Sequence, residues 1–181
     1  MNKIILASTS PRRKELLERE GIDFIIDASS IDETLDESLP IQERLMQLAK
    51  DKAEPIHCKY PQDIVIGADT VVYFHDRIIG KAKDENEARE ILTALSNQKH
   101  TVYSAVAIYI GDMLYTFCDE TVVYFKDILE MIDDYITSQE WIGKAGAYGI
   151  QGIAGKFVDH IDGDIDTVIG LPVKRVVKFL K

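Results

Sequence analysis

The sequence contains little cysteine and no long apolar run. Its 181 residues include two cysteines, Cys58 and Cys118. Their positions match neither a redox motif nor a metal-ligand spacing, which argues against a disulfide scaffold and a zinc site. We expect both to be reduced packing residues of a cytoplasmic protein. The apolar run at the N-terminus is short and Ser-Thr-Ser follows it, so the sequence predicts neither a signal peptide nor a membrane-spanning helix.

Basic residues are outnumbered by acidic ones. The chain has 21 Lys and Arg against 31 Asp and Glu, with a formal net charge of −10. General nucleic-acid binding requires a basic face, so this balance argues against it. A small anionic substrate in a local basic pocket is still compatible with the composition. The length suits a single domain over residues 1–181, or two small lobes that share a core.

Apolar periodicity predicts alternating strands and helices, and therefore a mixed α/β fold. The predicted strands cover residues 4–6, 24–26, 64–74, 78–79, 101–110, 113–117, 121–125, 157–161 and 167–169. The predicted helices begin near Pro11, Ile41, Asp84, Asp127 and Pro172, and we expect the second to end at Glu54. Ser10 is a good N-cap for the first helix, and Asp84 for the third.

The first turn of the first helix carries an unusual cluster of cations. Arg12, Arg13 and Lys14 follow one another, although the partial positive charge of a helix N-terminus favours acidic residues there. Free backbone N–H groups, the hydroxyls of Ser8 and Ser10 and two guanidinium groups would together form a cradle for phosphate. The alternative is a solvated basic turn, because the stretch lacks the glycines of a Walker motif.

Four charged residues further along the chain are candidates for the same chemistry. Asp69 interrupts an apolar strand, and a buried carboxylate needs a cation, a metal or a proton; the alternative is a structural Asp that caps a loop. Lys81 follows a hairpin that would bring it near Asp69, but a solvated loop lysine has the same pattern. Lys52 lies near a helix end, where lysines often complement the dipole. Glu33 lies in an acidic loop, and such loops are usually solvated.

A glycine-rich stretch, GKAGAYGIQGIAG, covers residues 143–155. Closely spaced glycines permit unusual backbone angles and close approach to a ligand. Gln151 within the stretch has both an acceptor and donors, so it could pair with a base edge or satisfy backbone groups. The alternative for the whole stretch is a flexible connector.

Cations, hydroxyls and carboxylates in this combination suit hydrolysis of a phosphoanhydride. Cations neutralise phosphate oxygens in the transition state. Mg²⁺, bound through one or two carboxylates and the substrate phosphates, would contribute further. A remaining carboxylate could orient or deprotonate the attacking water. The spacing does not show which phosphorus is attacked.

Several motifs resemble, in order and over nearly the whole chain, the Maf family of nucleotide pyrophosphatases. They include ASTSPRRKELL, IGADTVV, the Gly80-Lys81 pair and AGAYGIQG. The resemblance implies an elongated mixed β-sheet flanked by helices in two lobes with a central cleft, as in inosine-triphosphate pyrophosphatases. It also implies cleavage of a nucleoside triphosphate to the monophosphate and pyrophosphate with Mg²⁺ or Mn²⁺.

The resemblance also assigns roles to individual residues. Asp69 would be the catalytic carboxylate, and Glu33 and Asp69 would contribute to metal binding. Substrate preference would be set by Arg12, Thr70 and Gln151. The phosphate-binding set, combined with the reasoning above, is Ser8, Arg12, Arg13, Lys52 and Lys81.

The Gln151 version of the glycine-rich loop resembles the branch of the family that acts on dTTP and UTP. Thymine and uracil present an acceptor–donor–acceptor imide edge that an amide can pair with. A site built for that edge rejects analogues that leave its polar groups unpaired. The sister branch, which acts on 7-methyl-GTP, has a different sequence there. Two departures from the family are Ala82, where proline is frequent, and Ser104, where threonine is common.

Three alternatives stay open at this stage. The chain could be a nucleotide-binding regulator of septum formation without turnover, a 7-methyl-GTP pyrophosphatase, or an interaction protein that uses its acidic surface. The expected partner is a nucleoside triphosphate, with no nucleic acid and no membrane. The resemblance favours a homodimer, and the expected reduced cysteines favour the cytoplasm.

Overall fold

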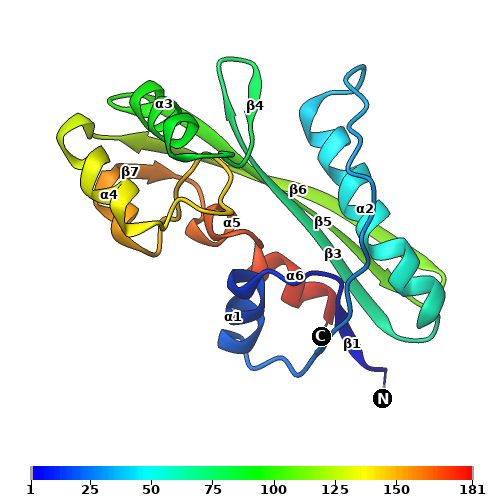
Figure 1. The fold of residues 1–181 in the computed structure, drawn as a ribbon. Helices are drawn as coiled ribbons and strands as arrows, with labels where there is room; N and C mark the ends of the chain where they lie inside the picture. The colour runs from blue at the N-terminus through cyan, green and yellow to red at the C-terminus, as the bar shows by residue number, and fades with distance from the viewer. Residues whose placement is uncertain (1, 181) are drawn as a thin grey trace. The chain divides into compact units, whose positions relative to one another are not determined.

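The strands of the chain form one mixed sheet. The computed structural model describes residues 2–180 (Figure 1). Within this part, seven strands are ordered β2-β1-β3-β5-β6-β7, with β4 paired to β3. β1 is parallel to both β2 and β3, whereas β4 and β7 are antiparallel to their partners. The strands are β1 (Ile4–Leu6), β2 (Ile25–Ile26), β3 (Ile64–Phe74), β4 (Arg77–Ile79), β5 (Lys99–Ile110), β6 (Met113–Phe125) and β7 (Val158–Asp162).

Helices flank this sheet, so the expected mixed α/β architecture is confirmed. The α-helices are α1 (Pro11–Arg19), α2 (Ile41–Lys59), α3 (Glu85–Leu95), α4 (Ile132–Ser138), α5 (Ile165–Ile169) and α6 (Val173–Leu180). Two 3-10 helices are η1 (Leu129–Met131) and η2 (Ile153–Phe157). Asp84 caps α3 as predicted, because its side chain accepts a hydrogen bond from the Glu87 backbone N–H at 2.8 Å.

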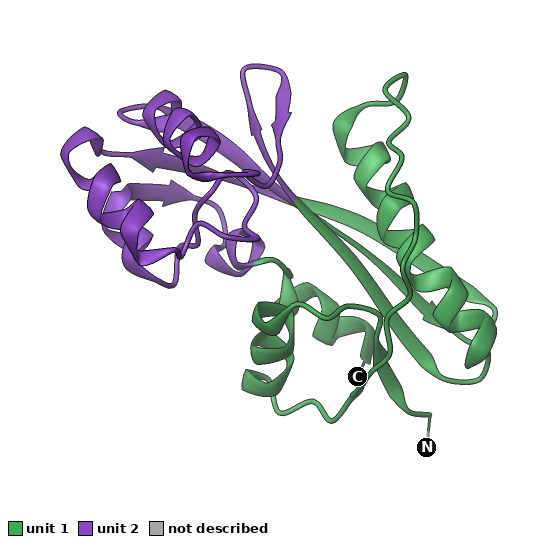
Figure 2. Ribbon diagram, viewed as in Figure 1, with its two compact units in different colours: residues 1–70, 104–119, 170–181 green, residues 71–103, 120–169 purple. Residues whose placement is uncertain are grey.

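The chain divides into two compact units, coloured separately in Figure 2. Unit 1 comprises residues 1–70, 104–119 and 170–181. Unit 2 comprises residues 71–103 and 120–169.

In unit 1, α2 packs very closely on β3. A Cβ at Gly67 would lie 2.4 Å from the backbone oxygen of Ala49 and 2.8 Å from the Cβ of Ala53. Only glycine leaves room for this approach, since real Cβ atoms do not come so near to backbone. The small residues Ala49 and Ala53 are themselves fully buried. The glycine therefore sets the distance between helix and strand.

Unit 2 has its own apolar core, in which α3 packs against α4. Trp141 belongs to this core and donates a hydrogen bond from Nε1 to the backbone oxygen of Ile136 at 3.2 Å. Burial of an indole with its N–H satisfied is a packing arrangement. Trp141 is therefore a packing anchor of unit 2.

Several predicted boundaries are wrong. The helix expected to end at Glu54 continues through Pro55 to Lys59, because its buried inner face continues with Ala53 and Ile56. The helix expected to open at Asp127 begins only with η1 and α4, although the Asp127 side chain does accept a hydrogen bond from the Leu129 N–H at 3.2 Å. The segments predicted as two strands over residues 113–125 form the single strand β6.

Residues 167–169, predicted as a strand, belong to the helix α5. The side chain of Asp164 accepts a hydrogen bond from the Asp166 backbone N–H at 2.9 Å and so starts a helical turn. A short β-branched run cannot by itself distinguish a strand from a buried helical turn. Ser10 occupies the N-cap position of α1 as predicted, but in the described structure its side chain makes no capping hydrogen bond.

Two expectations from composition can be compared with the structure. Within residues 2–180, no helix combines the length and the apolar character needed to cross a bilayer. Both cysteines are thiols, with Cys58 at the surface and Cys118 half-buried.

Candidate active site

Asp69 is a buried carboxylate with a lysine beside it. It lies within β3 and is 8% exposed. The Nζ atom of Lys52, from α2, donates a hydrogen bond to Asp69 Oδ1 at 2.6 Å and lies 2.9 Å from Glu33 Oε1. The cation that a buried Asp69 requires is therefore supplied by Lys52, and Glu33 joins the same cluster.

The close approach of α2 to β3 explains why these charges meet. Gly67 and Asp69 are two residues apart on β3, so their side-chain directions share one face of the sheet. That face is the one on which Ala53 of α2 packs. Lys52 immediately precedes Ala53 on this helix, which brings its ammonium within hydrogen-bond distance of Asp69.

Arg13 of α1 is fixed by three hydrogen bonds. Its Nε donates to the backbone oxygen of Gly170 at 2.9 Å, Nη1 to Ser8 Oγ at 3.0 Å, and Nη2 to Thr70 Oγ1 at 3.2 Å. A guanidinium has five N–H donors, so two are left after these bonds. Arg13 therefore ties α1 to the end of β1, to β3 and to the segment before α6, and it keeps donors for an anion.

The charges of this region influence one another. Burial lowers the pKa of the Arg13 guanidinium from its ordinary value, the negative charge of Asp69 opposes that shift, and Arg12 and Glu33 act more weakly in opposite directions. Such mutual influence means that the cations of α1 and the carboxylates form one electrostatic environment. The structure therefore brings together six predicted site residues of unit 1, namely Ser8, Arg13, Glu33, Lys52, Asp69 and Thr70, while Arg12 precedes Arg13 on α1 and acts on its pKa.

The third cation of the basic turn behaves differently from the two arginines. Lys14 pairs with Glu18 at 3.6 Å on the same helix, and both side chains are about half exposed, at 51% and 53%. Exposed pairs of this kind contribute little. The alternative reading of a solvated basic turn therefore holds for Lys14, whereas Arg13 is built into the structure.

The other two predicted site residues, Lys81 and Gln151, belong to unit 2. Lys81 forms an isolated β-bridge with Ala145, and the backbone N–H of Gly146 donates to the oxygen of Gly80 at 3.1 Å. Unit 2 thus pairs the segment containing Lys81 with the glycine-rich stretch. Gln151 in the same stretch is exposed.

The glycine-rich stretch is held by side chains on both sides of Gln151. Tyr148 shares a 2.6 Å hydrogen bond between its hydroxyl and His100 Nε2. Beyond Gln151, the backbone N–H of Ile153 donates to Glu140 Oε2 at 2.8 Å. These contacts to distant elements do not fit the alternative of a flexible connector.

Sequence reasoning missed two partners in unit 1. Ser104 Oγ lies 2.7 Å from Thr70 Oγ1, and the backbone oxygen of Gly170 receives hydrogen bonds from both Arg13 and Thr70. Ser104 was notable only as a departure from a family pattern. No local signal could have identified these contacts, because Gly170 is 100 residues from Thr70 and 157 from Arg13.

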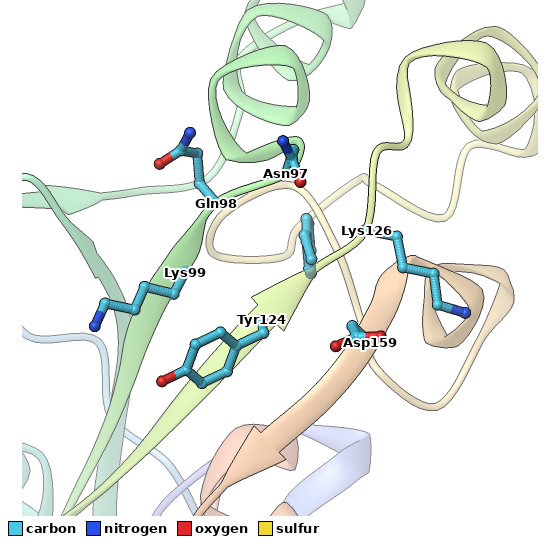
Figure 3. A pocket seen from close by; sticks show the side chains of 7 residues that line it. Asn97, Gln98, Lys99, Tyr124, Lys126 and Asp159 are labelled. Carbon is cyan, nitrogen blue, oxygen red and sulfur yellow. The ribbon is translucent and has the colours of Figure 1, made fainter.

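A separate hollow of about 520 Å³ lies in unit 2. Its lining residues are Asn97, Gln98, Lys99, Tyr124, Phe125, Lys126 and Asp159. Figure 3 shows that Lys99 and Lys126 extend in opposite directions, so they do not converge on a shared anion. None of the predicted site residues lines it, and we do not assign it to the site.

The carboxylates of unit 1 can be compared with what a divalent cation needs. Oxygens of Asp69 and Glu33 both lie within 3 Å of the Lys52 ammonium, so they converge on one position of positive charge. Within residues 2–180, His, Cys, Asp and Glu side chains form no group of three that could hold a metal. Asp69 and Glu33 are as many carboxylates as Mg²⁺ usually takes from a protein, with phosphates and water completing its shell.

The chain is similar to known proteins over nearly its whole length. Residues 3–181 match the family model described as Maf-like protein. A dTTP/UTP pyrophosphatase of Bacillus cereus is 47% identical over 182 residues, covering 100% of this chain and 95% of the relative. A Bacillus anthracis protein of the same name is 46% identical, with the same coverage.

Similarity to solved structures is weaker. A Vibrio cholerae protein has a TM-score of 0.47 and 11% identity, covering 93% of this chain and 88% of its own. A nucleoside-triphosphatase, a dITP/XTP pyrophosphatase from Mycobacterium abscessus, has a TM-score of 0.45 and 11% identity, covering 98% and 94%. The full-length family match and the sequence identity to the Bacillus proteins are decisive: this chain belongs to the family of Maf-like proteins.

Proposed function

We propose that this protein hydrolyses the pyrimidine nucleoside triphosphates dTTP and UTP to the nucleoside monophosphate and pyrophosphate. The names of the full-length Bacillus relatives support this substrate class. The observation that carries it is the cluster in which Lys52 joins Asp69 and Glu33, in the same electrostatic environment as the arginines of α1. A triphosphate tail brings several negative charges, and this region of an acidic protein offers three cations for it.

In the proposed reaction, Asp69 is the general base. It accepts a proton from water while the water oxygen bonds to the α-phosphorus. The bond from the α-phosphorus to the oxygen that bridges to the β-phosphate breaks. Pyrophosphate leaves with the electron pair of that bond. Lys52, which donates to Asp69 at 2.6 Å and lies 2.9 Å from Glu33 Oε1, would turn its remaining N–H to a phosphate oxygen. Arg12 and the two remaining donors of Arg13 would neutralise the charge that develops.

Mg²⁺ or Mn²⁺ is part of the proposal. Asp69 and Glu33 are the residues that would hold it, together with the substrate phosphates. When bound, the metal would supply positive charge to the phosphate oxygens.

Pyrimidine preference is assigned to Arg12, Thr70 and Gln151. The amide of Gln151 suits the imide edge of uracil or thymine, because it offers both a donor and an acceptor. Gln151 is at the surface of its loop, where a substrate can reach it. These assignments stay predictions, as do phosphate binding by Lys81, the homodimer and the cytoplasmic location.

The direct test is pyrophosphate release by the purified protein with Mg²⁺ and, separately, dTTP, UTP, CTP and 7-methyl-GTP. We expect turnover of dTTP and UTP with the monophosphate as second product. Preference for 7-methyl-GTP would place the chain in the other branch. Triphosphate binding without product would support a regulator, and a melting temperature unchanged by triphosphate and Mg²⁺ would favour the interaction protein.

A further inference from the structure

The hydroxyl of Thr70 is at the centre of a buried network. Its Oγ1 lies 3.2 Å from Arg13 Nη2, 3.2 Å from the backbone oxygen of Gly170 and 2.7 Å from Ser104 Oγ. Ser104 is fully buried on β5, and Thr70 lies beside the proposed base on β3. Three elements and the segment before α6 therefore meet at one hydroxyl group.

The donors and acceptors determine how this network is arranged. A guanidinium only donates and a carbonyl oxygen only accepts, whereas a hydroxyl has one proton and can accept two bonds. Thr70 accepts from Arg13 Nη2, so it must donate its proton to Gly170 or to Ser104. All three contacts form together only if Ser104 donates to Thr70 and Thr70 donates to Gly170.

This arrangement leaves Thr70 with nothing to offer a ligand. Its one proton is bonded within the protein, and both acceptor positions are occupied. An influence of Thr70 on substrate must then pass through the groups that it holds. The charged group among them is Arg13, whose Nε and Nη1 are fixed by Gly170 and Ser8 at 2.9 and 3.0 Å.

We propose that Ser104 is a positioning residue of the candidate active site. Its hydroxyl donates to Thr70, and Thr70 in turn fixes the guanidinium of Arg13 and with it the first turn of α1. The strength with which a triphosphate is held therefore depends on a buried serine that does not contact it. This inference rests on the proposed function, because it assumes that Arg13 binds phosphate.

The test compares Ser104→Ala with two other variants in the full-length protein. Ser104→Thr keeps the hydroxyl and should have the Kd and KM of wild type. Thr121→Val is a matched control, because Thr121 is a fully buried hydroxyl on the neighbouring strand β6 that donates to the Asp164 oxygen at 2.8 Å in unit 2. The readouts are the Kd of inorganic tripolyphosphate with Mg²⁺, the kcat and KM for UTP, and the melting temperature.

We expect Ser104→Ala to raise the tripolyphosphate Kd and the KM for UTP by roughly five- to tenfold, as for loss of one hydrogen bond, with kcat changed less. Thr121→Val should lower the melting temperature without changing Kd. If Ser104→Ala lowers only the melting temperature, as the control does, the positioning role is refuted. If wild type binds tripolyphosphate but releases no pyrophosphate, the proposed function fails, while the Kd comparison still tests Ser104.

A double-mutant cycle with Thr70→Val tests the route of the effect. If Ser104 acts through Thr70, adding Ser104→Ala to Thr70→Val should leave Kd unchanged. Equal effects of Ser104→Ala in both backgrounds would contradict the proposed route. Should Ser104→Ala fail to fold, the comparison of Ser104→Val with Ser104→Thr supplies the same answer, because the two side chains have the same shape and only threonine keeps the hydroxyl.

Discussion

Asp69 combines two properties that are difficult to reconcile in one residue. It lies on an apolar strand and is 8% exposed, yet Lys52 donates to it at 2.6 Å. An unpaired carboxylate in this position would be costly, so the lysine stabilises the folded state as well as serving the site. The sequence allowed this residue to be predicted, because an acidic side chain inside an apolar run needs an explanation of its own.

His100 gives unit 2 a pH dependence. It is 3% exposed, it shares a hydrogen bond with Tyr148, and burial lowers its pKa from 6.5 to about 4. The unfolded chain therefore binds a proton more readily than the folded one between these two values, so stability is full above pH 6.5 and is lost as pH falls toward 4. From pH 7 to 5 we expect a loss of about 2 kcal/mol from this group.

Denaturant unfolding of wild type and His100→Gln at pH 7 and pH 5 measures this contribution. Glutamine keeps a polar partner for Tyr148 but does not titrate in this range. The variant should lose about 2 kcal/mol less than wild type between the two pH values. An identical loss in both proteins would show that His100 does not titrate in this way.

At the scale of elements, the contact of α2 with β3 controls the geometry of the site. Gly67→Ala would place a Cβ 2.4 Å from the Ala49 backbone oxygen, and α2 would have to move. We expect a loss of stability of about 1–3 kcal/mol and a fall in turnover of up to roughly a hundredfold, because Lys52 moves relative to Asp69. The measurements are denaturant unfolding and pyrophosphate release.

Gly80→Ala is the control for this prediction. In the described structure its Cβ would have no heavy atom within 4 Å, and its φ is not in the positive range. The free energy of unfolding of Gly80→Ala should stay within about 0.5 kcal/mol of the wild-type value. If Gly67→Ala and Gly80→Ala lowered turnover equally, the close approach of α2 to β3 would not be what sets the geometry of the site.

The basic turn of α1 offers a second comparison within one element. Arg12→Ala should raise the KM for UTP about tenfold, because a charge-assisted contact to phosphate is lost. Lys14→Ala should leave the KM within about twofold, since Lys14 pairs with Glu18 at the surface and such pairs are weak. Steady-state kinetics of both variants measure the two KM values. Similar KM values for Arg12→Ala and Lys14→Ala would show that Arg12 does not bind the phosphates.

Elements were predictable where a local pattern dominated. The strand containing Asp69, the start of α1 at Pro11 and the cap of α3 at Asp84 all follow from short-range chemistry. Errors arose where packing at a distance decided the outcome, as in the passage of α2 through Pro55. The role of Gly67 was missed for the same reason, because its neighbours lie on another element.

At the scale of the whole molecule, the fold class and the family could be inferred from the sequence, because motifs recur in order along nearly the entire chain. The partners of Arg13 could not, since Gly170 lies 157 residues away and only the folded chain brings it near. Charge also acts at this scale. A formal net charge of −10 disfavours anions in general, so a triphosphate must be held by local cations and metal.

Metal removal therefore should affect turnover but not folding. Within residues 2–180 no three potential ligands form a structural metal site. Treatment with EDTA should abolish pyrophosphate release, and added Mg²⁺ or Mn²⁺ should restore it. The melting temperature without substrate should stay unchanged. Turnover that persists after exhaustive chelation would contradict the assignment of a metal to Asp69 and Glu33.

The most direct test of the account is the turnover of UTP by Asp69→Asn beside Asp166→Asn. Both aspartates are buried, at 8% and 1% exposure, but Asp166 belongs to unit 2 and is not one of the predicted site residues. We predict that Asp69→Asn stays folded and loses pyrophosphate release by about a thousandfold, as expected for loss of a general base, whereas Asp166→Asn retains it. Wild-type-like turnover by folded Asp69→Asn would contradict the account.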